Sequence, residues 1–254
     1  MYCPAIMTES RPDISFAIPC HNEAGTLREL VRQIEAQMTA LNRASEIVIV
    51  DDGSSDESWA VLKDLAASRS HLRALRLERN CGQSAALYTA IQATRGAYII
   101  TLDADLQNDP ADIPKLLAAL VDADCVCGTR KAARARGDSW LKQSISSIAN
   151  AIRRRVLGDA STDAGCTYRA FRREAFTGIP FFRGFHRFIP ILMAFNGARV
   201  VEVPVSNRAR MHGQSHYGMG LLARRAAVVD MFAVRWLKSR LVKIKISERL
   251  GEGP

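Results

Sequence analysis

Three side chains that carry oxygen, Asp103, Asp105 and Gln107, alternate along the chain directly after an apolar run at residues 97–102. The run is typical of a buried strand, and the turn signal at residues 108–110 indicates that a helix follows. Because alternate residues of an extended chain point to the same side, we expect the three oxygen donors to converge. Hard oxygen ligands suit Mg²⁺ or Mn²⁺ rather than zinc. A solvated acidic loop is the alternative interpretation of so short a motif.

The elements expected around this motif alternate between strands and helices. Strands are predicted near residues 13–18, 46–50, 72–77, 97–102 and 125–128, with a helix after each of the first four. This alternation predicts an α/β fold with a parallel sheet covered on both faces. In such sheets ligands bind beyond the carboxyl ends of the strands. Polar segments follow four of the strands, and we expect them to form one site: residues 19–23, 51–52, 80–83 and 103–107.

Several classes of nucleotide enzyme are disfavoured because their phosphate-binding motifs are absent from the sequence. The chain has neither a G-x-x-x-x-G-K-[ST] loop nor a G-x-G-x-x-G fingerprint, which argues against a kinase, an ATPase or a dehydrogenase. The remaining interpretation is a site in which carboxylates and a metal ion hold the nucleotide. In this interpretation Asp52 accepts hydrogen bonds from base N–H groups, and the ion neutralises phosphates.

Composition indicates a globular chain that works on the cytosolic side of a membrane or free in the cytosol. Its 254 residues are enough for one large core. No uninterrupted apolar run reaches spanning length, and no signal peptide is visible, so we expect neither. The six cysteines lack zinc-ligand spacing and suggest a reducing compartment. The expected localisation is therefore cytoplasmic, peripheral on the inner face of the membrane.

Charge divides the chain into an acidic and a basic half. Residues 1–127 hold 11 Lys and Arg against 18 Asp and Glu, whereas residues 128–254 hold 24 against 8. The basic half predicts an anionic partner: nucleic acid, a phosphorylated substrate or an anionic membrane surface. Residues 140–157 and 221–241 read as amphipathic basic helices, which suit either core packing or a membrane interface. No RNA-binding motif supports the nucleic-acid alternative.

Four ordered motifs resemble the family 2 glycosyltransferases of GT-A fold, and among them the dolichol-phosphate mannose synthase-like polyprenyl-phosphate glycosyltransferases. The resemblance extends from about residue 13 to 220 and implies a Rossmann-like, mixed but mainly parallel sheet with basic amphipathic C-terminal helices. The motifs are Pro19-x-His21-Asn22-Glu23, Val50-Asp51-Asp52-Gly53-Ser54-x-Asp56, Asn80-x-Gly82-x-x-x-Ala86 and Asp103-Ala104-Asp105-Leu106-Gln107.

The resemblance implies a role for each residue that matches a motif on the donor side. Base and ribose of the donor would be held by Pro19, His21, Glu23, Val50 and Asp52, with His21 replacing a tyrosine usual in the subgroup. Ala104 would lie against the donor, and Asp103, Asp105 and Gln107 would hold Mg²⁺ or Mn²⁺.

The second half carries matches to the phosphate-binding and acceptor elements. Arg130 and Arg210 would grip phosphates, and His216 stands where the family has a lysine. Asp163, in an element that lies beside the acceptor in the family, is interpreted as a positioning residue rather than a base. The reason is that a phosphate acceptor is already largely anionic at neutral pH.

The resemblance implies an inverting, metal-dependent hexosyltransferase that moves a sugar from a nucleotide diphosphate to a polyprenyl phosphate, undecaprenyl or dolichyl. The alternative is a family 2 enzyme with a glycan or lipid-glycan acceptor in envelope polysaccharide or lipid A synthesis. A separate membrane-spanning partner protein is a further expectation. The expected divisions are a mobile lead-in at 1–12, a nucleotide-sugar half at 13–128, an acceptor half at 129–220, and a basic helix with tail at 221–254.

Overall fold

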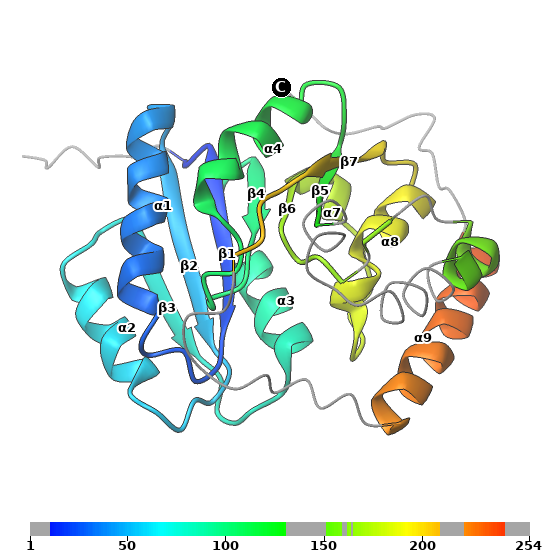
Figure 1. Cartoon of the computed structure of the whole chain (residues 1–254), viewed down its shortest axis with the longest axis horizontal. Coiled ribbons are helices and arrows are strands. Elements are labelled where there is room, and N and C mark those ends of the chain that lie inside the picture. Colours follow the sequence, from blue (N-terminus) through cyan, green and yellow to red (C-terminus); the bar gives the residue numbers. More distant parts are fainter. Residues whose placement is uncertain (1–10, 131–150, 159–161, 164, 209–220, 242–254) are drawn as a thin grey trace, which may run out of the picture.

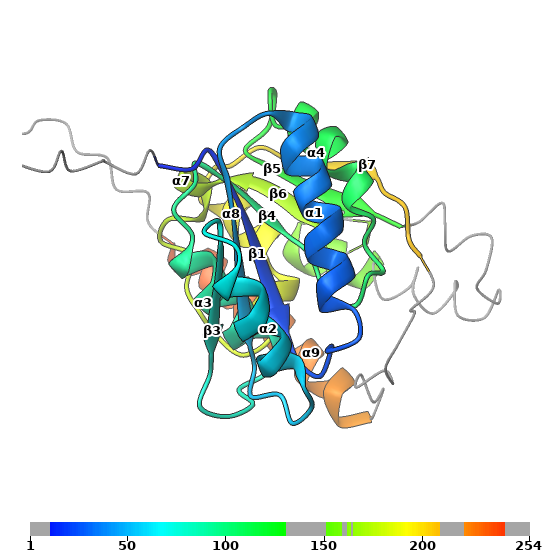
Figure 2. The same cartoon turned by 90° about the vertical axis from the view of Figure 1, so that its left-hand side faces the viewer.

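The structure, a computed structural model, describes residues 11–130, 151–158, 162–163, 165–208 and 221–241. A seven-stranded sheet in the order β3-β2-β1-β4-β6-β5-β7 forms its centre, and helices cover both faces (Figures 1 and 2). The strands are β1 (Ile14–Cys20), β2 (Ser45–Asp51), β3 (Leu72–Arg76), β4 (Tyr98–Thr101), β5 (Cys125–Thr129), β6 (Arg169–Arg172) and β7 (Val200–Pro204). The helices are α1 (Leu27–Leu41), α2 (Ser58–Ala67), α3 (Gln83–Ala93), η1 (Pro110–Asp112), α4 (Ile113–Ala119), α7 (Arg173–Phe176), η2 (Phe185–Arg187), α8 (Ile189–Phe195) and α9 (Leu221–Arg240).

The sheet is mixed, as the resemblance implies, because one strand runs against its neighbours. Strands β1 to β4 pair in parallel, and β5 pairs in parallel with β7. Between them lies β6, which is antiparallel to both β4 and β5. The alternation of strands and helices alone predicted a parallel sheet and missed β6. Its sequence, Arg-Ala-Phe-Arg, is short and bounded by charges, so it gives no clear strand pattern.

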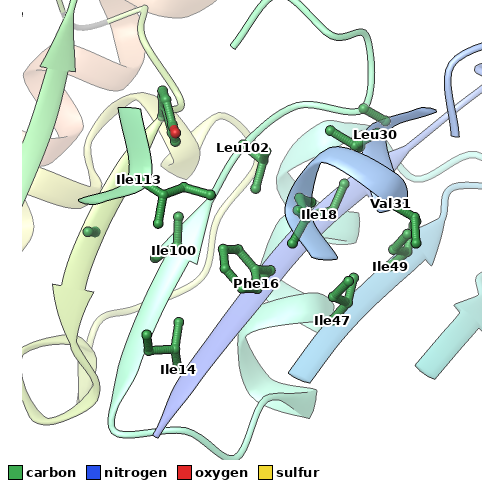
Figure 3. Packing of buried hydrophobic residues seen from close by; sticks show 14 of the residues in the cluster. Ile14, Phe16, Ile18, Leu30, Val31, Ile47, Ile49, Ile100, Leu102 and Ile113 are labelled. Atoms are coloured by element: carbon green, nitrogen blue, oxygen red, sulfur yellow. The ribbon is translucent and has the colours of Figure 1, made fainter. Parts of the chain in front are cut away.

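Each face of the sheet packs against its own helices. Figure 3 shows one face, where Phe16 and Ile18 of β1 meet Leu30 and Val31 of α1. Helices α2 and α4 cover the same face, while α3, α8 and α9 pack on the other. Burying a side chain of this size contributes about 1.5–3 kcal/mol relative to leaving it exposed. The core therefore holds the strands, and with them the loops at their ends, in fixed positions.

The carboxyl ends of the strands meet at one rim of the sheet. Pro19 pairs with Val50, and β4 ends at Thr101 beside them. Pro19 was expected in a turn, but it lies within β1. The polar segments that follow these strands consequently lie at the same edge, as the parallel pairing requires.

The amphipathic helices expected in the basic half are described in part. Helix α9 agrees with the helix expected at 221–241. Of the helix expected at 140–157, residues 151–157 are described and helical, with Leu157 buried and Ile152 exposed. Within the described residues, no helix combines the length and the hydropathy needed to cross a bilayer.

Gly53 joins two of the rim loops at a close backbone contact. Its φ is +61°, and a Cβ placed there would lie 2.6 Å from the Asn80 nitrogen and 2.7 Å from the carbonyl carbon of Arg79. Gly82 also has positive φ, +92°, but a Cβ there would meet nothing within 4 Å. A substitution at Gly53 therefore adds both a steric clash and backbone strain, whereas a substitution at Gly82 adds backbone strain alone.

We predict that Gly53→Ala lowers the free energy of unfolding by about 2–4 kcal/mol, because a Cβ would force two backbones apart in addition to the strain at positive φ. Gly82→Ala should cost about 1–2 kcal/mol, from strain alone. Urea unfolding of both variants measures the difference. Equal losses would contradict the close approach of the two loops.

Candidate active site

The acidic motif lies in a turn at the end of β4. Residues 104–105 form a turn and Leu106 has a φ of 61°, so the segment is not extended. The expectation that Asp103, Asp105 and Gln107 align by strand alternation is wrong for this reason. The turn nevertheless brings Asp103 and Asp105 close enough for their charges to interact.

Both carboxylate oxygens of Asp103 accept hydrogen bonds from neighbouring side chains. Gln83, the first residue of α3, donates from Nε2 to Oδ1 at 2.8 Å, and the hydroxyl of Thr167 donates to Oδ2. Burial and the charge of Asp105 nevertheless raise the pKa of Asp103, against the effect of the two hydrogen bonds and of Arg130. The fold thus holds a carboxylate in a place that disfavours its ionised form.

The backbone of the turn is fixed from three further directions. The hydroxyl of Thr26, just before α1, donates to the Ala104 carbonyl oxygen at 2.7 Å. The Asn108 side chain accepts from the Asp103 amide at 3.2 Å. The amide of Arg208, beyond β7, donates to the Gln107 carbonyl oxygen at 2.9 Å. Thr26 and Arg208, which are distant in sequence, and the nearby Asn108 together define one conformation of the turn.

The donor set at the turn fits a hard divalent cation. Two carboxylates that lie close together, one of them with a raised pKa, form an acidic pair that a cation would stabilise. No cluster of three His, Cys, Asp or Glu side chains suited to a metal occurs among the described residues. The pair would therefore be completed by the amide oxygen of Gln107, which is partly exposed, or by oxygen atoms of a substrate.

Asp52 anchors a neighbouring loop. It is 2% exposed, and its two oxygens accept from the amides of Cys81 and Gly82 at 2.7 and 2.9 Å. His21 lies beside it, with Nδ1 2.9 Å from the Asp52 carbonyl oxygen, and Asn80 Nδ2 lies 3.1 Å from His21 Nε2. The sequence predicted that the Asp52 carboxylate accepts hydrogen bonds from a nucleotide base. Such bonds would compete with those that Asp52 already accepts from the amides of Cys81 and Gly82.

The other residues expected to hold base and ribose line the same rim at different depths. Val50 is fully buried, and its side chain packs in the cluster that includes α3. Pro19 is buried beside it in the sheet. Glu23 is partly exposed, and its amide donates to the Ser58 hydroxyl at 2.8 Å. Glu23 and His21 are thus the accessible members of the set.

Arg130 and Asp163 form a buried ion pair just beyond β5. The Arg130 amide, Nε and Nη2 donate to the two Asp163 oxygens at 3.1, 2.9 and 3.1 Å. Burial alone would lower the pKa of Arg130, but the bonds to Asp163 and the charge of Asp103 raise it. This geometry supports Asp163 as a residue that orients Arg130, and it leaves the carboxylate poorly placed to act as a base.

The segment that carries Asp163 is itself supported by β7. Glu202 accepts from the amide and the hydroxyl of Thr162 at 2.7 and 2.6 Å. Thr162 also lies 3.2 Å from the Thr129 hydroxyl, next to Arg130. Glu202 therefore helps to place the ion pair.

Two predicted phosphate ligands, Arg210 and His216, lie outside the described residues. Arg208, near the start of their segment, binds both oxygens of Asp109 and donates to Gln33 Oε1 at 2.8 Å. These contacts fix Arg208, the last described residue before that segment.

Sequence reasoning missed Thr26, Asn108 and Thr167, which hold the acidic turn, and Glu202, which supports the Arg130–Asp163 pair through Thr162. Gln83 belongs to the polar segment 80–83 that was expected at the site, but its bond to Asp103 was not predicted. Thr26, Thr167 and Glu202 bind residues that are distant in sequence, which leaves no local pattern.

A comparison with known families identifies the architecture. The family model described as Glycosyl transferase family 2 matches residues 15–179. The chain belongs to glycosyl transferase family 2. The family and the GT-A fold expected from the motifs are thereby confirmed.

The family 2 relatives include two curated transferases of similar sequence. Undecaprenyl-phosphate 4-deoxy-4-formamido-L-arabinose transferase of Edwardsiella ictaluri is 38% identical over 208 residues, which is 81% of this chain and 63% of the relative. The protein of the same name from Sodalis glossinidius is 39% identical over 207 residues, with the same coverage. The chain thus covers less than two thirds of the length of these relatives.

Among solved structures, the fold is similar to glucosyl-3-phosphoglycerate synthase from Mycobacterium tuberculosis. The complex of that enzyme with Mn²⁺ and uridine-diphosphate-glucose superposes with a TM-score of 0.65 at 21% identity, covering 88% of this chain and 79% of that one. The likeness at this identity supports the shared fold of the family 2 enzymes.

We predict that Asp103→Asn raises the melting temperature of the protein in EDTA. Asparagine removes a charge that burial and Asp105 disfavour, while its side chain still offers hydrogen-bonding partners to Gln83 and Thr167. Thermal unfolding of the variant and the wild type in EDTA measures the change. An unchanged or lower melting temperature would show that the acidic pair is not strained.

Proposed function

We propose that this family 2 glycosyltransferase moves a sugar from a nucleotide diphosphate to a polyprenyl phosphate with inversion of configuration, at the cytosolic face of a membrane. The observation that carries the proposal is the clamped turn with Asp103 and Asp105, which lies on one rim with the Arg130–Asp163 pair. Both relatives are named for transfer to undecaprenyl phosphate, which supports the acceptor class.

In this proposal each group on the rim has a distinct task toward the donor. Asp103, Asp105 and Gln107 would hold Mg²⁺ or Mn²⁺, which when bound supplies positive charge to the diphosphate leaving group. Arg130 would add guanidinium donors next to this site, with Asp163 fixing its orientation. His21 and Glu23 would meet the nucleoside, and Ala104 would lie against the donor. Arg210 and His216 would reach the phosphates from their segment.

The ion pair between Asp163 and Arg130 favours a phosphate acceptor over a glycan acceptor. A sugar hydroxyl needs a base to remove its proton, whereas a phosphate oxygen is already anionic and can attack the anomeric carbon directly. Asp163 accepts three hydrogen bonds from Arg130 and is thereby committed to an ion pair. The alternative with a glycan or lipid-glycan acceptor would require a different base.

The sugar is the least constrained part of the proposal. A hexose was expected from the resemblance, but the relatives are named for 4-deoxy-4-formamido-L-arabinose, a pentose derivative. We therefore propose the pentose derivative as the first donor sugar to test, linked to UDP or GDP.

We predict that the wild type transfers labelled sugar to undecaprenyl phosphate without added glycan, and that EDTA abolishes transfer. Asp105→Ala should lower the rate about 100-fold or more, because a ligand of the cation is lost, while the protein remains folded. Label in the lipid extract measures transfer, and thermal unfolding checks the fold. Substantial turnover by Asp105→Ala would remove the metal role, and label only on an added glycan would favour the alternative acceptor.

Helix α9 offers a surface for the membrane that holds such an acceptor. Its inner face packs on the core through Met231 and Val234. Phe232 and Trp236 on the outer face are 58% and 60% exposed, and Arg240 lies over the Trp236 ring. Val228, Val229, Arg235 and Lys238 are exposed on the same helix. Exposed aromatics beside basic residues suit an anionic lipid surface.

We predict that the Phe232→Ser/Trp236→Ser double variant binds vesicles containing phosphatidylglycerol at least about tenfold more weakly than the wild type, because apolar area leaves the bilayer interface. Val121→Ser is the matched control, since Val121 is 77% exposed but lies between α4 and β5. Vesicle sedimentation measures binding. Equal binding by all three proteins would exclude the exposed aromatics of α9 as the contact. No binding by the wild type would leave a membrane-spanning partner protein as the alternative anchor.

A further inference from the structure

The two side chains that grip Asp103 come from segments that are tied together behind the site. Gln83 is followed by Ser84, at the start of α3, and Thr167 stands two residues before Arg169, at the start of β6. Ser84 and Arg169 both bond to one residue of η2, His186.

The contacts of His186 connect its ring to one segment and its backbone to the other. Ser84 Oγ lies 2.6 Å from the imidazole Nδ1, and Arg169 Nη1 donates to the His186 carbonyl oxygen at 2.7 Å. The amide of Gly184 donates to Ser84 Oγ at 2.9 Å. Because the Ser84 oxygen already accepts from Gly184, we assign its own proton to the bond with Nδ1, which places the imidazole proton on Nε2.

Burial keeps this imidazole neutral. His186 is 7% exposed, and burial, helped by the charges of Arg187 and Arg169, lowers its pKa to about 3. With the ring neutral and its proton assigned to Nε2, Nδ1 accepts the bond from Ser84 at any pH at which the protein works. The hydrogen bond between Ser84 and His186 therefore does not act as a pH switch.

Arg169 depends on the same residue for its position. It is 1% exposed, its Nε has no hydrogen-bond partner, and in the described part of the chain no carboxylate pairs with it. Its Nη1 bond to the His186 carbonyl is consequently the polar contact that orients it. A buried cation with so few partners is costly unless its position is fixed. The bond from Arg169 to the His186 carbonyl oxygen therefore holds η2 against the start of β6.

We propose that His186 is a positioning residue for the acidic turn: it holds the start of α3 at a fixed distance from the start of β6, and so places Gln83 and Thr167 around the carboxylate of Asp103. The inference rests on the proposed function, in which Asp103 holds the cation. Ligand groups must be placed within about 0.5 Å for productive binding. Phe185 of η2 also packs edge-on against Tyr88 of α3, with ring centroids 5.7 Å apart, so the variants below are chosen to separate the hydrogen bond from this packing.

Two substitutions of His186 separate the hydrogen bond from packing. His186→Leu fills similar space but removes the acceptor, whereas His186→Asn can present Oδ1 near the position of Nδ1. Ser84→Ala removes the same bond from the other side, together with the bond from the Gly184 amide, and deletes only one oxygen. The matched control is Thr94→Ala at the opposite end of α3, where the hydroxyl bonds to the Ile91 carbonyl and accepts from Arg173.

Calorimetric titration of each protein with Mn²⁺ in the presence of UDP measures the effect, alongside its melting temperature. We expect His186→Leu and Ser84→Ala to raise the dissociation constant for Mn²⁺ about tenfold, as the loss of a residue behind a metal ligand typically does. His186→Asn should restore most of the affinity. Thr94→Ala should bind as the wild type does even where its melting temperature falls. In transfer assays, saturating Mn²⁺ should recover most of kcat in Ser84→Ala.

Unchanged Mn²⁺ affinity in both His186→Leu and Ser84→Ala would overturn the inference, as would affinity that follows melting temperature in all variants including Thr94→Ala. If His186→Leu fails to fold, Ser84→Ala decides the question. A wild type that binds no Mn²⁺ in the presence of UDP would overturn the proposed function and this inference together, whereas tight binding by every variant would overturn the inference alone.

Discussion

The structure depends on holding two carboxylates close together at the rim of a sheet. Such a pair is unfavourable in itself, because burial and mutual repulsion both oppose ionisation, and the raised pKa of Asp103 expresses that cost. The chain sustains it with hydrogen bonds from Thr26, Gln83 and Thr167, which belong to three distant segments. A turn that is fixed before any cation arrives loses little further freedom on binding, which is the physical basis of preorganisation.

The antiparallel strand β6 is what joins the two halves of the chain at this turn. It lies between β4 and β5, so the residues just before it, including Thr167, reach the rim next to Asp103. The same stretch carries Asp163 to Arg130 at the end of β5. The acidic half thus provides the carboxylates and two of the groups that orient them, Thr26 and Gln83, and the basic half provides Thr167 and a guanidinium beside them.

Much of the fold and the location of the site could be predicted from the sequence, because both depend on local patterns. The β-α alternation of the first half and the polar residues after each strand were sufficient to place Asp103, Asp105 and His21 on one rim. The conformation of the turn could not be predicted, because the left-handed backbone at Leu106 is maintained by contacts with distant segments. Asp52 shows the same limit: the sequence indicated a base ligand, but the amides of Cys81 and Gly82 occupy its oxygens.

The most direct test of this account is the anomalous diffraction of crystals grown with Mn²⁺ and UDP. The account predicts one strong manganese peak at the turn, within coordination distance of a carboxylate oxygen of Asp103 or Asp105 and of a diphosphate oxygen. A peak at another place, or UDP bound with no manganese at the turn, would contradict it.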